Sequence, residues 1–180
     1  NEIRNKNTLH GLSNNFTTSL EIDLLKRNVY IGTQDGGLSI YNITTEEFTN
    51  IDITHGLSSD KITTLKLDSV NNKLFIATGH ERVWYYGEGA GLSVYDIATN
   101  TFLNKDMTDG LSSNRIVALE FSSRKDYLYV GAVSYSGNTT YRGGLNIYYS
   151  ITDTFSYEVL GNGLPSNIIQ TMVMENCNST

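Results

Sequence analysis

The stretch GLSSNRIVALEFS, residues 110–122, decides the fold because the chain repeats it. Its counterparts are GLSNNFTTSLEID at residues 11–23, GLSSDKITTLKLD at residues 56–68 and GLPSNIIQTMVME at residues 163–175. The repeat glycines are 45, 54 and 53 residues apart, at Gly11, Gly56, Gly110 and Gly163. Repeats of this length are typical of propeller blades and related arrays, in which similar units share one continuous core.

Each repeat contains four short segments with the pattern of β-strands, separated by turn residues. In the first segment, the residues nine and eleven places after the repeat glycine are apolar, as a strand with one buried side requires. These pairs are Leu20 and Ile22, Leu65 and Leu67, Leu119 and Phe121, and Met172 and Met174. The second segment reads NVYIGT, KLFIAT and YLYVGA, the third reads GGLSIYN, AGLSVYD and GGLNIYY, and the fourth contains Phe48, Phe102 or Phe155.

One position of the second segment is small in every copy, which predicts close contact between neighbouring sheets; it holds Gly32, Ala77 and Gly131. Four antiparallel strands in about 50 residues form the β-propeller blade. We therefore expect an all-β fold with about three complete blades and one strand of a further blade at each end. The expected units are an outer strand of a preceding blade at residues 1–10, blades at 11–55, 56–109 and 110–162, and an inner strand of a following blade at 163–180.

The motif GLSSN-x-I-x-x-L, followed by Y-I-G-T-x-x-G-G-L-x-x-Y-N, resembles the two-component regulator propeller repeat. Residues 29–33 and 36–38 carry the match best, with residues 110–119 close behind. The resemblance implies an extracytoplasmic propeller, as in the sensor regions of bacterial hybrid histidine kinases and in other surface or secreted propellers. That family has no fixed catalytic set, so the resemblance implies no catalytic residue. The chain departs from the family where it often has Trp, at Tyr30, Phe75 and Tyr129.

Both ends of the sequence fall inside a repeat. Residues 3–10 align with residues 48–55, the end of a repeat, whereas residues 167–174 form a first segment with no successors. Open strand edges invite pairing with other strands. We therefore expect a segment of a longer chain with blades on both sides, or a neighbouring subunit at the open edges.

Composition argues against several classes of partner. The formal net charge is -6, and no run of Lys and Arg exceeds two residues. A nucleic-acid surface would need a basic stripe, so we expect no nucleic-acid partner. No apolar run approaches the roughly 18–20 residues of a membrane span, so this segment is not expected to cross a membrane. The one cysteine, Cys177, cannot form an internal disulfide and does not report the compartment.

The polar composition and the family resemblance together predict a secreted or cell-surface location. Sequons for N-glycosylation are present, although chance placement of the many Asn, Ser and Thr residues gives a similar number. Two of them fall in predicted turns, where a glycan is tolerated. The candidate glycosylation sites are Asn15, Asn42, Asn138 and Asn178.

The candidate binding residues lie in two enlarged connections. The connection from second to third strand is short near residues 34–35 but grows at residues 80–90 and 134–142. In a propeller these connections share a face with the loops that join blades, and insertions in repeat proteins often mark the binding face. The alternative is that they pack on each other or on the next blade. Aromatic residues with Arg are typical of binding hot spots, and the candidates for a protein or carbohydrate ligand are His80, Arg82, Trp84, Tyr85, Tyr86, Glu88, Tyr135, Tyr141 and Arg142.

The residue before each repeat glycine is a metal ligand by type: His10, His55, Asp109 and Asn162. Loops of neighbouring blades are expected to lie too far apart to share an ion whose bonds are about 2.0–2.2 Å long, so a turn-capping or loop-polarity role is the favoured interpretation and we expect no metal site. No set of nucleophile, base and oxyanion donors is recognisable, and no cofactor is expected.

We therefore expect a non-enzymatic binding or structural module at the cell surface. One alternative is the sensor ectodomain of a hybrid two-component system that binds a glycan-like ligand. The least favoured alternative is a secreted propeller lyase or hydrolase that uses His80, Arg82 and Tyr141.

Overall fold

The computed structural model describes residues 5–79, 89–124, 126–133, 143–158, 169 and 171–173. Within these residues, the strands form three four-stranded antiparallel sheets, and no α-helix is present. Each sheet keeps its strands in chain order, and each strand pairs with the next through a hairpin. The prediction of an all-β fold built from four-stranded blade-like units is confirmed.

The strand bounds follow the repeat. The first sheet contains β1 (Thr17–Asp23), β2 (Asn28–Thr33), β3 (Leu38–Asn42) and β4 (Phe48–Ile51). The second contains β5 (Ile62–Asp68), β6 (Lys73–Thr78), β7 (Leu92–Asp96) and β8 (Thr101–Lys105). The third contains β9 (Ile116–Phe121), β10 (Tyr127–Val133), β11 (Gly143–Tyr149) and β12 (Thr154–Glu158). Short 3-10 turns precede β1, β5 and β9, namely η1 (Thr8–His10), η2 (Ile53–His55) and η3 (Met107–Asp109).

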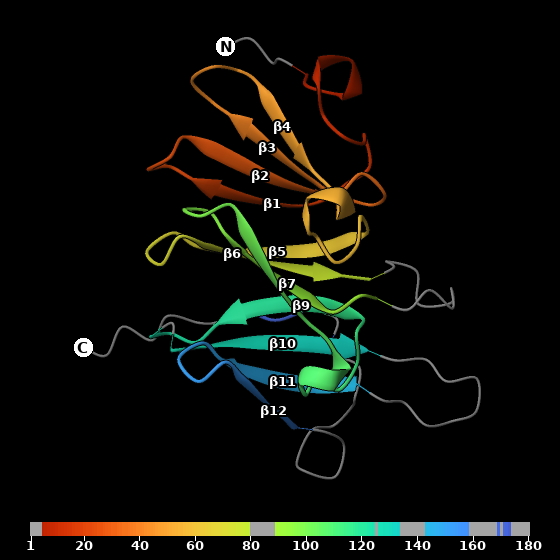
Figure 1. Cartoon of the computed structure of the whole chain (residues 1–180), viewed down its shortest axis with the longest axis vertical. Coiled ribbons are helices and arrows are strands. Elements are labelled where there is room, and N and C mark those ends of the chain that lie inside the picture. The colour runs from red at the N-terminus through yellow and green to blue at the C-terminus, as the bar shows by residue number, and fades with distance from the viewer. Residues whose placement is uncertain are drawn as a thin grey trace.

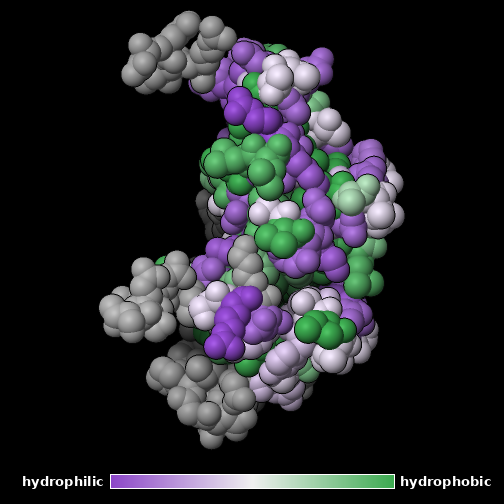
Figure 2. Space-filling view, turned by 90° about the vertical axis from the view of Figure 1, so that its left-hand side faces the viewer, coloured by the Kyte–Doolittle hydropathy of each residue, from purple (hydrophilic) through white to green (hydrophobic). Residues whose placement is uncertain are grey.

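The three sheets follow one another along the long axis of the molecule (Figure 1). Their first strands contact each other in succession, β1 against β5 and β5 against β9. In the side view of Figure 2, the described part of the stack forms an arc on which apolar residues appear as separate patches among polar ones. We call the packing of the first sheet on the second the first junction, and that of the second on the third the second junction.

Each junction has its own apolar core. The core of the first junction is formed by Tyr30, Leu38, Ile51, Leu57, Ile62, Leu65, Leu74, Ile76 and Tyr95. The core of the second is formed by Phe75, Ala77, Leu92, Val94, Leu111, Ile116, Leu119, Phe121, Leu128, Val130 and Tyr148. Because the repeat supplies residues to both faces of the middle sheet, strands β6 and β7 are buried along almost their whole length.

The small residue of the second strand is required by the approach of the next blade. A Cβ atom on Gly32 would lie 2.6 Å from Ile62 Cγ2, and one on Gly131 would lie 3.0 Å from Ile169 Cγ2. Real Cβ contacts are almost never that short, so a side chain at Gly32 would push the two sheets apart. Ile169 thus packs on the third sheet as Ile62 packs on the first. The fourth inner strand that the sequence predicts at residues 163–180 otherwise lies outside the described residues and stays a prediction.

The two sides of the first sheet differ in exposure. Leu20 of β1 is 61% exposed, whereas its equivalents Leu65 and Leu119 are 4% and 6% exposed. Those two leucines are covered by the preceding sheet, so the side of the first sheet that carries Leu20 offers an apolar surface of the kind that a blade covers elsewhere in the stack.

The outer strand expected at residues 1–10 falls mostly outside the described residues. Residues 3–6 are the equivalents of β4, and residues 1–4 are not described, so this strand stays a prediction. Thr8–His10 forms η1, the equivalent of η2 after β4; the Asn7 side chain caps this turn, and Gly11 ends it with a φ of 106° in the left-handed region, where glycine is unstrained. The assignment of the other units to residue ranges stays a prediction.

Candidate functional site

The 3-10 turns line one edge of the stack, where each blade is joined to the next (Figure 1). Each turn has a capping box, in which the cap side chain and the last residue of the turn bond each other's backbone N–H groups. The caps are Asn7, Asp52 and Asp106, and their partners are His10, His55 and Asp109. The prediction that these partner residues cap turns is confirmed, while Asn162 lies outside the described residues.

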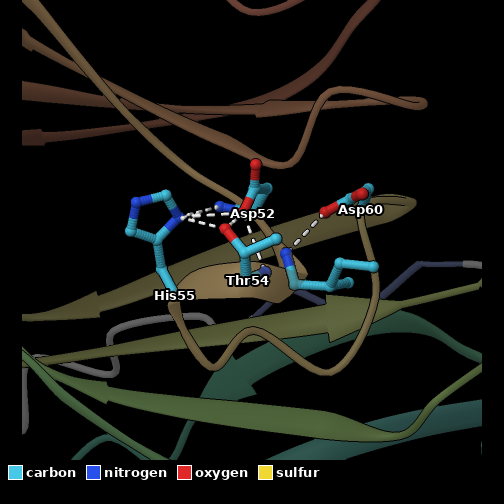
Figure 3. A network of polar contacts seen from close by, with 5 residues as sticks. Asp52, Thr54, His55 and Asp60 are labelled. Atoms are coloured by element: carbon cyan, nitrogen blue, oxygen red, sulfur yellow. Dashed lines mark hydrogen bonds and ion pairs between the residues drawn. The ribbon is translucent and has the colours of Figure 1, made fainter.

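Figure 3 shows this network at η2. The carboxylate of Asp52 accepts hydrogen bonds from the Thr54 backbone N–H at 2.8 Å and from the Thr54 hydroxyl at 2.6 Å, and His55 Nδ1 lies 2.8 Å from the same oxygen. These groups lower the pKa of Asp52 to about 2, the Thr54 hydroxyl having the largest effect. The Thr108 hydroxyl lowers the pKa of Asp106 in the same way. Both carboxylates are therefore ionised well below neutral pH.

A second clamp holds the beginning of each turn, and sequence reasoning missed it. The first backbone N–H of η2, on Ile53, donates to Asp60 Oδ1 at 2.9 Å (Figure 3). Asn15 and Asn114 accept the equivalent bonds from η1 and η3. All three acceptors occupy the fifth position of the GLSSN motif, which is always Asn or Asp, and that regularity could have indicated a shared structural role. The fifth residue of the GLSSN motif therefore fixes the beginning of the 3-10 turn that precedes the motif.

The roots of the second-to-third strand connections dock on the next blade. The N–H of Gly37 donates to the Asp60 carbonyl at 3.0 Å, and the N–H of Gly91 donates to the Asn114 carbonyl at 2.9 Å. The fit is tight, because a Cβ on Gly89 would lie 2.1 Å from the Asn114 carbonyl oxygen. These connections therefore start and end at the same edge as η2 and η3.

The residues predicted to bind a ligand lie outside the described residues. All nine belong to residues 80–88 and 134–142, whose neighbours Gly79, Gly89, Val133 and Gly143 are described. The structure thus places the roots of both enlarged connections, and the binding role of the nine residues stays a prediction.

The sequons are placed in part. Asn15 is exposed, although its side-chain oxygen accepts a hydrogen bond from Thr8. Asn42 ends β3, and its Nδ2 atom, to which a glycan would be attached, donates to Asn28 Oδ1 at 3.1 Å. Asn138 and Asn178 lie outside the described residues. Among the described residues, no group of three or more His, Cys, Asp or Glu side chains is placed to hold a metal ion.

No family model matches the sequence, and no curated protein matches it. Among solved structures, the fold is similar to the extracellular domain of BT3049 from B. thetaiotaomicron, assigned to a hybrid two-component system. The TM-score is 0.68 at 21% identity, over 88% of this chain and 19% of that one. This chain therefore spans about a fifth of the length of that domain.

Two further similarities agree on the fold. The computationally designed protein Ika4 gives a TM-score of 0.60 at 19% identity, over 89% of this chain and 80% of that one. The extracellular domain of BT4673 from B. thetaiotaomicron gives a TM-score of 0.51 at 15% identity, over 89% of this chain and 25% of that one. At these identities the likenesses show the blade-like fold alone.

Proposed function

We propose that the chain is a non-enzymatic binding module of an extracellular β-propeller of the two-component regulator propeller type. The contact surface is the edge that carries η1, η2 and η3 together with the enlarged connections at residues 80–88 and 134–142. The observation that carries the proposal is the docking of the connection roots on the next blade, through bonds such as that from Gly91 to Asn114. Because the end of the first enlarged connection is held on the next blade at this edge, we expect its aromatic and Arg residues to be presented there.

Support for an extracytoplasmic location comes from the BT3049 and BT4673 domains, which are extracellular. In the part of the chain that the structure describes, no helix has the length and apolar character to cross a membrane. The exposed side of the first sheet around Leu20 supports a neighbouring blade or subunit as a structural partner.

The sensor ectodomain of a hybrid two-component system is the second candidate, favoured by the likeness to BT3049. It predicts that the gene encodes a membrane-spanning helix and a histidine kinase domain after the propeller. A gene that encodes only further repeats would favour a structural or adhesive role.

Replacement of Trp84 by Ala tests the proposed surface, with a glycan microarray and a panel of cell-surface proteins as probes. We expect at least a tenfold loss of affinity for whichever probe the protein binds, since aromatic hot spots dominate interfaces. Tyr157→Ala is the matched control, because Tyr157 is an aromatic residue that is 54% exposed on the outer strand β12. Equal affinity of the Trp84→Ala variant and the unmodified protein would refute the binding surface.

A further inference from the structure

A crevice of about 430 Å³ lies at the first junction, between the first and second sheets. One wall comes from β2, β3 and β4, and the other from β7 and the turn that follows it. Small-molecule sites in proteins commonly have volumes of roughly 300–1,000 Å³. The crevice is lined by Asn28, Tyr30, Ile40, Asn42, Thr49, Asn50, Ile51, His55, Tyr95, Ile97 and Asn100.

The lining is polar without being charged. Among the residues that the structure describes, four Asn, one Thr, one His, two Tyr and three Ile line the crevice, with no Asp, Glu, Lys or Arg. A charged ligand would lose its hydration without gaining a counter-charge. A wholly apolar ligand would leave the amides without water and without partners. The lining therefore suits an uncharged ligand with several hydroxyl groups.

Two of the amides are held in fixed orientations. Asn42 Nδ2 donates to Asn28 Oδ1 at 3.1 Å, and the Tyr95 hydroxyl donates to Asn100 Oδ1 at 2.6 Å. Within the described part of the chain, the Nδ2 group of Asn100 makes no hydrogen bond of its own, while the Asn28 side chain is close enough to the Tyr30 hydroxyl to oppose the rise in the Tyr30 pKa that burial causes. Asn100 thus keeps two N–H donors, and Asn28 at least one, for a ligand or water.

The Tyr30 hydroxyl is a further polar group of this wall. The side chain is completely buried, and within the described residues its hydroxyl has no hydrogen-bond partner. A buried polar group left in this way costs about 1–3 kcal/mol. The fold does not need the hydroxyl, because Phe75 occupies the equivalent position at the second junction and packs there with its ring centroid 6.0 Å from that of Tyr148.

The second junction has charged residues at positions that are neutral in the first. Lys105 stands there in place of Ile51, and Asp153 in place of Asn100. The Lys105 side chain is 8% exposed, and its Nζ atom lies 2.6 Å from Asp153 Oδ2. The equivalent cavity of this junction is somewhat smaller, at about 330 Å³, and its lining, which includes Phe75 and Tyr148, also contains the charged residues Asp68 and Lys73.

We propose that the crevice at the first junction is a binding site for an uncharged, polyhydroxylated molecule of monosaccharide size. The Nδ2 groups of Asn28 and Asn100 and the Tyr30 hydroxyl donate hydrogen bonds to it, and Ile40 and Ile97 contact its apolar faces. This site is separate from the enlarged connections, so it adds a second binding site to the proposed function and does not depend on it.

Calorimetric titration of the full protein with D-glucose, D-galactose, N-acetyl-D-glucosamine and myo-inositol tests the site. We expect saturable binding of at least one of these probes at one site per chain, and no binding of D-glucuronate. Tyr30→Phe is expected to weaken binding about fivefold through the loss of one hydrogen bond, with no loss of folding, because Phe75 shows that the ring alone is accommodated.

A pair of exchange variants supplies the sharpest control. The I51K/N100D variant places the ion pair of the second junction in the crevice and is expected to abolish binding. The K105I/D153N variant changes the second junction to the same extent and is expected to leave binding at the crevice unchanged. Should I51K/N100D fail to fold, Asn100→Ala takes its place, with an expected loss of at least fivefold.

Three outcomes would overturn the site. They are no saturable binding of any neutral probe, unchanged affinity in both Tyr30→Phe and I51K/N100D, or equal loss in K105I/D153N. Trp84→Ala separates this site from the proposed function, since it should leave monosaccharide binding unchanged.

Discussion

At the first junction, Ile51 and Asn100 stand where the second junction has Lys105 and Asp153. Both junctions keep the same side-chain hydrogen bond: the Tyr95 hydroxyl donates to Asn100 over 2.6 Å, and the Tyr148 hydroxyl donates to Asp153 over 2.9 Å. The first junction holds a crevice of about 430 Å³ with an uncharged lining, whereas the cavity at the second junction is about 330 Å³ and lies between charged residues. Two positions, one in each of two successive repeats, therefore distinguish a neutral junction from a charged one.

Among the variants that test this comparison, Asp153→Asn is expected to have the largest effect on the free energy of unfolding. Among the described residues, Lys105 would then keep Asp109, 4.0 Å from its Nζ atom, as its acidic partner. Removal of one partner from a buried ion pair costs about 3–5 kcal/mol; because Asp153 is 46% exposed, we expect about 2–3 kcal/mol here. Urea denaturation measures the loss. A change below about 0.5 kcal/mol would show that the pair does not stabilise the second junction.

The double variant K105I/D153N sharpens the comparison, because it gives the second junction the residues of the first. No charge is then left buried, and the neutral pair of Tyr148 and the new amide repeats the bond of Tyr95 with Asn100. We expect the double variant to be more stable than Asp153→Asn alone by at least about 1 kcal/mol. Additive destabilisation in the same urea experiment would contradict the equivalence of the junctions.

The junctions also differ at the small residue of the second strand, where the first junction leaves less space for a side chain than the second. A Cβ on Gly32 would lie 2.6 Å from Ile62, whereas the second junction already holds Ala77 at this position. Gly32→Ala is expected to cost about 1–3 kcal/mol through overpacking, and the reverse change Ala77→Gly about 1 kcal/mol through added backbone freedom. Thermal melting of both variants checks the order. Stabilisation by Gly32→Ala would mean that the first two sheets have room to spare.

Acid should weaken the ion pair of the second junction. The hydrogen bond from Lys105 is the main cause that lowers the pKa of Asp153 below its usual value. A lowered pKa in the folded chain gives stability that is present above about pH 4 and is lost as the pH falls through the folded value. We expect the unmodified protein to lose more stability than K105I/D153N between pH 5 and pH 3, in urea titrations at each pH. Parallel pH profiles would contradict the role of Asp153.

The repeat made the fold predictable, because its features are local. Paired apolar residues such as Leu65 and Leu67 predicted the first strands, and the small residue at Gly32 predicted the close approach of the next sheet. His55 was correctly predicted to cap its turn, because loops of neighbouring blades were expected to lie too far apart for a shared metal ion. The turn η1 occupies the place of η2 in the alignment of residues 3–10 with residues 48–55.

The crevice could not be predicted from the sequence. Asn28 and Asn100 are 72 positions apart and belong to different blades, and each looks like an ordinary turn residue in its own repeat. Their proximity depends on how one sheet is placed on the next. The signal that was available is a difference between equivalent positions of successive repeats: Ile51 is followed by Lys105 at one position, and Asn100 by Asp153 at another. The sequence alone therefore showed that Lys105 and Asp153 are charged where the equivalent residues are neutral.

Residue-resolved NMR titration tests the contrast between the junctions most directly. The neutral sugar or polyol that binds by calorimetry is added to ¹⁵N-labelled protein, and the amide signals of both junctions are followed together. We predict saturable shifts of the Asn28 and Asn100 side-chain amides and of the Tyr95 backbone amide, and no shift at Lys73, Tyr148 or Asp153. Shifts at both junctions, or none at the first, would contradict the account.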